Sequence, residues 1–169
     1  MSDALLVIDM QEAYVGEHRF PYLKYSMPDL LTTVNGVIDA YADEKRLIVY
    51  IRNVMERSLL SRLSPFKVYE DTLESKLVEG LHVASNHVFV KHAGDAFSNP
   101  QLHAFLKENN VDSVKIVGVD GGGCVALTAL GAIEHGYHVV VDEPAIGTTF
   151  ERSKRKHFRK LKELGTEFV

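Results

Sequence analysis

The sequence contains three residues whose side chains together could carry out covalent chemistry: an aspartate, a lysine and its single cysteine. Asp9 and Lys91 each follow a short apolar run, and Cys124 stands behind three consecutive glycines. A thiolate attacks electrophilic carbonyls, a carboxylate can take the thiol proton, and an ammonium favours both anions. These residue types predict covalent catalysis, with Cys124 as nucleophile, Asp9 as general base and Lys91 as the charge that stabilises them.

The position of Cys124 also predicts a thiol that is more acidic than usual. A free thiol has a pKa near 8.5, so only about 3% of it is thiolate at pH 7. Cys124 stands where a predicted strand turns into a helix, and the unpaired N–H groups of a first helical turn favour an anion. Together with Lys91, these groups need to supply only about 2 kcal/mol to lower the pKa to ~7.

The three glycines before the cysteine, Gly121–Gly123, fit the same chemistry. Attack on a carbonyl creates an oxyanion, which is stabilised by backbone N–H donors at about 2.7–3.1 Å. Glycine permits the turns that aim consecutive amides into one concavity. We also expect that a side chain at Gly122 or Gly123 would crowd an approaching substrate.

Buried strands and amphipathic helices alternate along the chain and must position these residues. Short apolar segments rich in Val and Ile predict six strands: Ala4–Ile8, Leu47–Ile51, Val88–Val90, Val114–Val119, His138–Val141 and Thr166–Val169. Apolar residues at helical spacing predict four helices: one from Pro28 to about Tyr41, one beginning at Pro100 after a Ser98 or Asn99 cap, Cys124–His135 and Phe150–Leu164. This alternation predicts a doubly wound, Rossmann-like α/β domain of three layers, α/β/α, around a mostly parallel six-stranded sheet.

Ligands of such sheets bind beyond the carboxyl ends of the strands, at the point where the strand order reverses. Asp9, Lys91 and Cys124 all fall at or just after such ends. We therefore expect the three side chains to meet at one mouth. The least regular stretch, Arg52–Tyr69, is interpreted as a loop or lid.

The composition predicts a single domain, residues 1–169, in the cytoplasm. The 46% hydrophobic and 25% charged residues are ordinary for a globular protein. The net charge of −4 gives no electrostatic reason to expect a nucleic-acid or membrane partner. One cysteine cannot form an internal disulfide, which favours a reducing compartment. The opening MSDALLVIDM lacks a basic region, and its apolar run ends at Asp9, so neither a signal peptide nor a membrane span is expected.

Three stretches of the sequence, in this order, carry a resemblance to a known family. They read LLVIDMQEAY, VFVKHAGDAF and VKIVGVDGGGCVALTALGAIEHGYHVVVDEPA, and they resemble the isochorismatase-like cysteine hydrolases, which include nicotinamidases and N-carbamoylsarcosine amidohydrolase. The resemblance implies a triad of Asp9, Lys91 and Cys124 that hydrolyses a small amide or related C–N bond through a thioester. It also implies a homo-oligomer, a dimer or tetramer, and no cofactor.

The same resemblance assigns further residues. It implies a cis peptide bond between Val119 and Asp120, and an oxyanion hole formed by the backbone N–H groups of Asp120 and Cys124. Four more residues would contribute to substrate binding: Gln11, Tyr14, Phe97 and Gly123.

The sequence departs from the family at three points. Nicotinamidases carry an Asp-x-His pair and a later His that bind a metal, whereas the stretch after the second strand reads RNVMERSLL, so we expect no metal site. Isochorismatases lack the cysteine, which disfavours hydrolysis of a vinyl ether. Gly121 stands where the family usually has Thr, a change in the turn itself.

Two other functions remain open. Gly121–Ala126 fits the dinucleotide fingerprint G-x-G-x-x-A, with Asp142 at the end of the next predicted strand, although this function leaves Asp9 and Lys91 without a role. A non-catalytic interaction module on the same fold is the second. The basic run 154–160 is interleaved with apolar residues at helical spacing and predicts a solvated helix face, and the eight histidines form no metal-binding motif.

Overall fold

A six-stranded parallel sheet forms the centre of the computed structural model, which describes residues 2–17, 19–58 and 67–169. The strand order is β3-β2-β1-β4-β5-β6, and each neighbouring pair is parallel. The strands are β1 (Asp3–Ile8), β2 (Leu47–Asn53), β3 (Val88–Lys91), β4 (Ser113–Val119), β5 (His138–Gly147) and β6 (Glu167–Phe168). The predicted doubly wound α/β fold is therefore confirmed.

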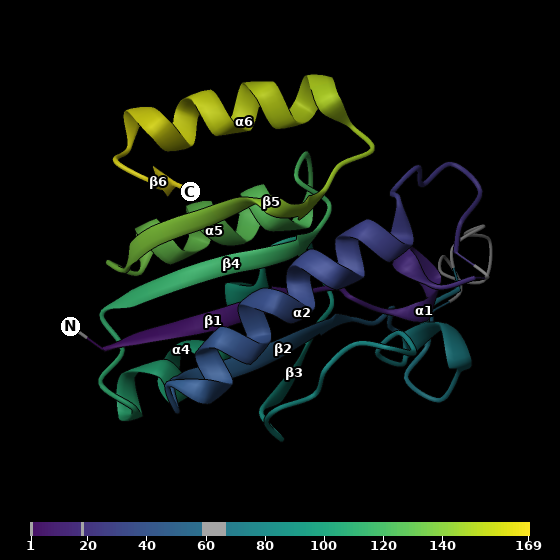
Figure 1. The fold of residues 1–169 in the computed structure, drawn as a ribbon, viewed down its shortest axis with the longest axis horizontal. Helices are drawn as coiled ribbons and strands as arrows, with labels where there is room; N and C mark the ends of the chain where they lie inside the picture. Colours follow the sequence, from purple (N-terminus) through teal and green to yellow (C-terminus); the bar gives the residue numbers. More distant parts are fainter. Residues whose placement is uncertain (1, 18, 59–66) are drawn as a thin grey trace.

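Helices cover both faces of this sheet (Figure 1). They are α1 (Glu12–Val15), α2 (Met27–Asp43), α4 (Pro100–Glu108), α5 (Cys124–Glu134) and α6 (Glu151–Glu163), with the short 3-10 turns η1 (Leu73–Ser75) and η2 (Ala96–Ser98). The continuous apolar run of β1 explains the three layers, because its alternate residues serve different cores. Leu6 and Ile8 pack with α4, α5 and α6, whereas Leu5 and Val7 pack with α1 and α2.

The helices begin where their sequences predict. Asn99 caps α4, since its side chain accepts a hydrogen bond from Gln101 N at 3.0 Å, and Pro100 occupies the first turn. The basic run 154–160 lies in α6, where Phe158 and Leu161 are buried, in agreement with the predicted amphipathic helix.

Three details differ from the sequence-based expectation. Strand β5 extends to Gly147, well beyond Val141, because a register shift between Ile116 and Gly118 lets β4 and β5 pair again after an irregular stretch. The short elements α1, η1 and η2 were not expected, since three or four residues are too few to show a period. Of the expected loop Arg52–Tyr69, the first two residues still belong to β2, and residues 59–66 lie outside the described part.

The strand order reverses between β1 and β4, and the two strands approach closely there. A Cβ atom on Gly118 would lie 2.1 Å from the Ile8 carbonyl oxygen, and Gly118 has a φ of +112°. Both facts favour glycine at this position. The segments that follow β1 and β4 are thereby brought side by side.

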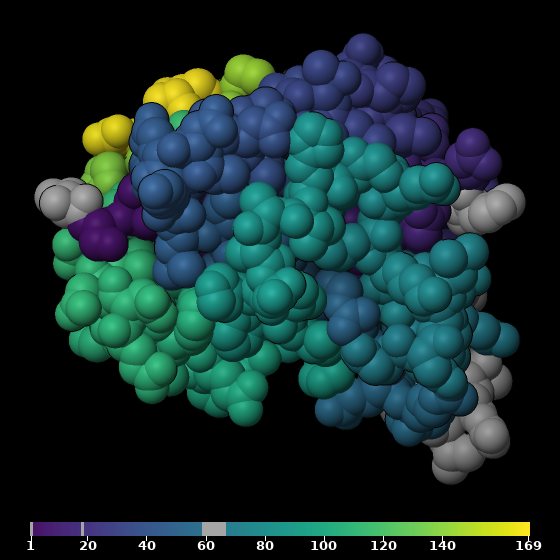
Figure 2. All heavy atoms as spheres, turned by 60° about the horizontal axis from the view of Figure 1, so that its bottom comes forward, coloured from purple at the N-terminus to yellow at the C-terminus, as the bar shows by residue number. Residues whose placement is uncertain are grey.

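The segment between η1 and β3 runs along α2 before it enters the sheet (Figure 2). Asn35 of α2 fixes it from both sides, donating to Gly80 O at 2.8 Å and accepting from His82 N at 2.9 Å. This segment leads into β3, whose last residue is Lys91. Within the described residues, no helix has the length and apolar character needed to span a membrane.

Candidate active site

Asp9, Lys91 and Cys124 meet at the carboxyl ends of the strands. Lys91 Nζ lies 3.0 Å from Asp9 Oδ2 and donates to Cys124 Sγ over 3.2 Å. Asp9 and Lys91 are 2% and 1% exposed, whereas Cys124 remains partly exposed. The structure thus brings together the three residues that the sequence singles out. Asp9 and Lys91 are more deeply buried than Cys124.

Local backbone geometry turns these side chains toward one another. Asp9 follows β1 with a left-handed φ of 52°, which aspartate tolerates better than most residues, and its N–H donates to Ile51 O of β2 at 3.0 Å. Lys91 ends β3 and also donates to Ala93 O at 3.0 Å. The three N–H donors of the ammonium therefore have three partners.

Burial and mutual charge decide how Asp9 and Lys91 ionise. Burial raises the pKa of the Asp9 carboxyl, and the Lys91 ammonium offsets part of this rise. For Lys91, burial opposes the charge, but the Asp9 carboxylate and Cys124 outweigh it and hold the pKa of the amine above its usual value. Asp9 Oδ2 faces Lys91, while Oδ1 is buried without a hydrogen-bond partner among the described residues. Lys91 is thus a cation, and Asp9 has an oxygen free to accept a proton.

The thiol is not acidified as the sequence predicts. Burial, and then the Asp9 carboxylate, raise the pKa of Cys124 to about 12, and Lys91 offsets this only in part. The expectation of a pKa near 7 counted the helix N-terminus and Lys91 but not the loss of water around the sulfur. Cys124 is therefore a thiol in the resting protein and must lose its proton to a base as it attacks.

The turn between β4 and α5 is held together by the Asp120 carboxylate. Its Oδ1 accepts from Gly122 N at 2.6 Å, and its Oδ2 accepts from Tyr25 OH at 2.9 Å and Thr149 N at 2.6 Å. The Val119–Asp120 peptide bond is cis, the isomer that the resemblance implies. Asp120 thus fixes the turn to two segments distant in sequence. The sequence gives no signal for the roles of Tyr25 and Thr149.

The backbone amides of this turn divide into two groups. Gly121 N donates to the end of β5, and Gly123 and Val125 N–H groups donate to Asp120 O at 3.0 and 3.1 Å. The N–H groups of Asp120 and Cys124 have no hydrogen-bond acceptor within the described part of the chain. These are the two donors expected to form the oxyanion hole.

The three glycines of the turn have different surroundings. A Cβ on Gly122 would lie 2.5 Å from Phe150 O, so this residue must be small to fit against the start of α6. A Cβ on Gly123 would meet no atom closer than 3.9 Å. The crowding of substrate by a side chain therefore stays a prediction at Gly123, whereas at Gly122 the protein itself occupies the space. A Cβ on Gly121 would lie 2.6 Å from Thr148 Oγ1, which shows that Thr148 fills the space beside this glycine.

Tyr14 and Gln11, both expected to bind substrate, have different surroundings. Burial raises the pKa of Tyr14, and the Asp9 carboxylate raises it further. The Tyr14 hydroxyl accepts a hydrogen bond from Asn53 Nδ2 at 3.1 Å. Gln11 is fully buried; its amide donates to Asn53 O at 3.1 Å and Ser75 O at 2.9 Å and accepts from Asn53 N at 2.7 Å. Both donors of Gln11 are therefore used to hold the rim of the site.

Phe97 lies in the core rather than beside the sulfur. It is buried with ring centroids 5.1 Å from His135 and 5.6 Å from Tyr137. His135 follows the end of α5, about 16 Å along the helix axis from Cys124. The sequence motif alone could not distinguish a pocket-lining ring from this packed one.

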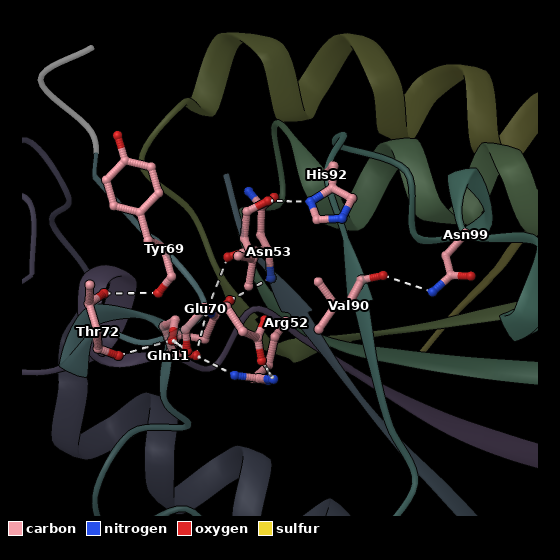
Figure 3. A network of polar contacts seen from close by, with 11 residues as sticks. Gln11, Arg52, Asn53, Tyr69, Glu70, Thr72, Val90, His92 and Asn99 are labelled. Carbon is pink, nitrogen blue, oxygen red and sulfur yellow. Dashed lines mark hydrogen bonds and ion pairs between the residues drawn. The ribbon is translucent and has the colours of Figure 1, made fainter. Parts of the chain in front are cut away.

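A polar network occupies the region after β2, where a nicotinamidase-like metal motif would lie (Figure 3). Arg52 pairs with Glu70 at 2.5 Å, Asn53 Nδ2 donates to Tyr14 OH at 3.1 Å, and His92 Nδ1 lies 2.7 Å from a backbone carbonyl. In the described ranges no three His, Cys, Asp or Glu side chains are grouped to hold a metal. The donor set of these described residues does not fit a metal ion.

The dinucleotide interpretation gains no support from this geometry. The Asp142 carboxylate, expected to bind a ribose, is instead 3.3 Å from Lys115 Nζ. The interpretation also gives no role to the buried pair of Asp9 and Lys91.

Known proteins share this fold. The zinc complex of pyrazinamidase from Pyrococcus horikoshii superimposes with a TM-score of 0.85, at 25% identity over 100% of this chain and 99% of that one. N-carbamoylsarcosine amidase from Thermoplasma acidophilum gives a TM-score of 0.84 at 22% identity, covering 99% and 95% of the two chains. An uncharacterized isochorismatase family protein of Bacillus subtilis (strain 168), YddQ, is 26% identical over 153 residues, 88% of this chain and 79% of the relative. The isochorismatase domain model matches residues 3–169, and the chain therefore belongs to the isochorismatase family of hydrolases.

Proposed function

We propose that this protein is a cysteine-dependent hydrolase that cleaves a small amide or a related C–N bond. The observation that carries the proposal is the meeting of Asp9, Lys91 and Cys124, in which one buried ammonium contacts both the carboxylate and the sulfur. A binding module has no need of an unpartnered carboxylate oxygen beneath a thiol, because burying such a group is costly.

The first half of the reaction forms a thioester. Asp9 Oδ1 takes the thiol proton while Cys124 Sγ attacks the carbonyl carbon, and the carbonyl oxygen becomes an oxyanion. The backbone N–H groups of Asp120 and Cys124 stabilise that oxyanion. The C–N bond then breaks, Asp9 returns its proton to the nitrogen, and ammonia or an amine leaves.

The second half releases the acid. Asp9, again a carboxylate, removes a proton from a water molecule as its oxygen attacks the thioester carbon. The C–S bond breaks, the sulfur recovers the proton, and a carboxylic acid departs. Lys91 keeps its charge throughout and holds Asp9 in place, which gives it a positioning and electrostatic role. Because the resting thiol is protonated, Asp9 is essential to the first step.

We further propose a cytoplasmic homo-oligomer as the working form, in line with the single cysteine and the family resemblance. Its partner is a small-molecule amide, with no nucleic acid or membrane.

Ammonia release from a panel of small amides and ureas tests the function. Pyrazinamide and N-carbamoylsarcosine, suggested by the names of the two structural relatives, belong in the panel beside simple aliphatic amides. Cys124→Ala and Asp9→Asn should each abolish turnover, and a stalled substrate should add its acyl mass to Cys124. Lys115→Met, which alters an ion pair at β4 and β5, is the matched control and should retain activity. Turnover that survives Cys124→Ala would rule out the thioester.

A further inference from the structure

The Lys91 ammonium takes one of its three partners from the loop that follows β3. Lys91 Nζ donates to Ala93 O at 3.0 Å, in addition to its contacts with Asp9 and Cys124. We call residues 92–95, which lie between β3 and η2, the lysine loop. Because an ammonium is held by the acceptors around it, the position of Ala93 O helps to decide where this charge lies.

The end of the lysine loop is joined to α5, the helix that begins with Cys124. Ala96 N, directly after the loop, donates to Thr128 Oγ1 at 3.0 Å, and this hydrogen bond is buried. Thr128 is itself fully buried and lies one helical turn beyond Cys124, on the same face of α5. A hydrogen bond shielded from water therefore connects the loop that holds Lys91 to the helix that carries the nucleophile.

Two glycines let the loop and the helix approach closely. A Cβ on Gly131 of α5 would lie 2.4 Å from Asp95 Oδ2, so this glycine leaves room for the carboxylate of the loop. A Cβ on Gly94 would lie 2.5 Å from Leu127 Cδ1, so a side chain at this place in the loop would displace Leu127. The loop is therefore packed against α5 on both sides of Thr128.

The other anchors of the loop lead toward the sheet. His92 Nδ1 lies 2.7 Å from Val54 O, just beyond β2, and Asn99 Nδ2 donates to Val90 O of β3 at 2.8 Å (Figure 3). Within the described ranges, Thr128 is thus the residue of α5 that holds residues 92–98 by a hydrogen bond.

From these contacts we propose that Thr128 is a positioning residue for the Lys91 ammonium. Its hydroxyl fixes Ala96 N, the loop in turn fixes Ala93 O, and this carbonyl holds Lys91 Nζ between the carboxylate and the sulfur. The catalytic consequence of this role rests on the proposed function, whereas its effect on the thiol needs no substrate. Since Thr128 acts through the loop, it is not a catalytic residue.

Alkylation of Cys124 by iodoacetamide tests this role without a substrate. Thr128→Val keeps the shape of the side chain but removes the acceptor, which releases the loop and lets the ammonium move away from the sulfur. Because the Lys91 charge lowers the pKa of Cys124, alkylation at pH 9 should slow at least about three-fold. Thr128→Ser keeps a hydroxyl and should retain most of the rate. Thr166→Val, the matched control, alters a buried threonine whose hydroxyl has no hydrogen-bond partner among the described residues, and should leave the rate unchanged.

A background without the two charges distinguishes the positioning of the ammonium from a general effect on the fold. In the Asp9→Asn/Lys91→Met protein there is no ammonium to displace, so Thr128→Val should change the alkylation rate by less than about two-fold. An equal change in both backgrounds, or no slowing when Asp9 and Lys91 are present, would overturn the role. If Thr128→Val does not fold, Gly131→Ala makes the same test, because its Cβ displaces the Asp95 carboxylate from α5 and should slow alkylation at least about two-fold, again only with Lys91 present.

Turnover separates this inference from the proposed function. With an amide that the unaltered protein hydrolyses, Thr128→Val should lower kcat at least about ten-fold and change KM less than about three-fold, since the ammonium acts on the reacting groups. If no amide is hydrolysed but the alkylation results are as expected, the hydrolase proposal fails and the positioning role stands. If amides are hydrolysed while Thr128→Val changes neither alkylation nor kcat, the positioning role fails alone.

Discussion

Replacing Lys91 by methionine tests whether its ammonium stabilises the buried Asp9 carboxylate. The free energy of unfolding measures this effect more directly than a loss of activity does. Lys91→Met keeps most of the side-chain volume but removes the ammonium from between Asp9 and Cys124. The Asp9 carboxylate would then be buried without a counter-ion. Breaking a buried ion pair in this way costs about 3–5 kcal/mol. We expect the free energy of unfolding at pH 7 to fall by roughly that amount.

A control ion pair in the same sheet gives the expected contrast. Lys115 Nζ lies 3.3 Å from Asp142, but the Lys115 side chain is 24% exposed and the pair is partly solvated. Lys115→Met should therefore cost about 1 kcal/mol or less. Urea unfolding of both variants, followed by circular dichroism, measures the two values under one set of conditions. A loss of stability for Lys91→Met no greater than that for Lys115→Met would show that the buried ammonium does not stabilise the Asp9 carboxylate.

The pH dependence of the stability loss and a second variant test whether the buried Asp9 carboxylate causes that loss. A carboxyl whose folded pKa is raised favours the folded state when it is protonated, so stability falls as pH rises from the unfolded pKa through the folded one. Without Lys91 the folded pKa of Asp9 rises further, so Lys91→Met should lose less stability at pH 5 than at pH 7. Adding Asp9→Asn should recover much of the lost free energy, because a neutral amide needs no counter-ion. A pH-independent loss, or no recovery in the double variant, would show that packing rather than charge is responsible.

Three further predictions concern the nucleophile and its turn. The rate at which iodoacetamide alkylates Cys124 should show no inflection between pH 6 and 9, because the pKa of Cys124 is raised to about 12. Asp9→Asn removes a charge that raises this pKa, so it should accelerate alkylation while abolishing turnover. Gly122→Ala should reduce stability by about 1–3 kcal/mol in urea unfolding, since its Cβ meets backbone at 2.5 Å, whereas Gly123→Ala should cost less. Tyr25→Phe removes one of three donors to the turn's carboxylate and should cost about 1.5–3 kcal/mol, together with a lower kcat; unchanged kcat and stability would exclude its role in the turn.

Sequence reasoning reached the fold and the triad because both depend on strong, local patterns. Apolar runs such as Ala4–Ile8 identify buried strands, and parallel strands place their carboxyl ends at one edge of the sheet. The residue that follows β1, the last residue of β3 and the first residue of α5 are therefore expected to lie near one another. The exact contact, with Lys91 between Asp9 and Cys124, follows from backbone details such as the left-handed Asp9 that no pattern encodes.

What sequence reasoning missed lies in contacts between distant segments. The acidity of Cys124 was misjudged because burial depends on the packing of the whole site, not on neighbours in the chain. The hydrogen bonds that Tyr25 and Thr149 donate to the Asp120 carboxylate could not be predicted for the same reason.

Gly121 shows how such distant contacts can compensate for a local change. The sequence marks it as a departure from the family, because a threonine is expected at this place in the turn. In the structure the hydroxyl of Thr148 lies 2.6 Å from where a Gly121 Cβ would be, so a side chain from the end of β5 occupies the space that the turn leaves open. The same Cβ would also lie 2.9 Å from Ile146 Cγ2, so a larger residue at Gly121 would require both Thr148 and Ile146 to give way. The local sequence motif thus identifies the position of the nucleophile. The shape of the turn that holds the nucleophile also depends on the end of β5, which pairs with β4 in the sheet.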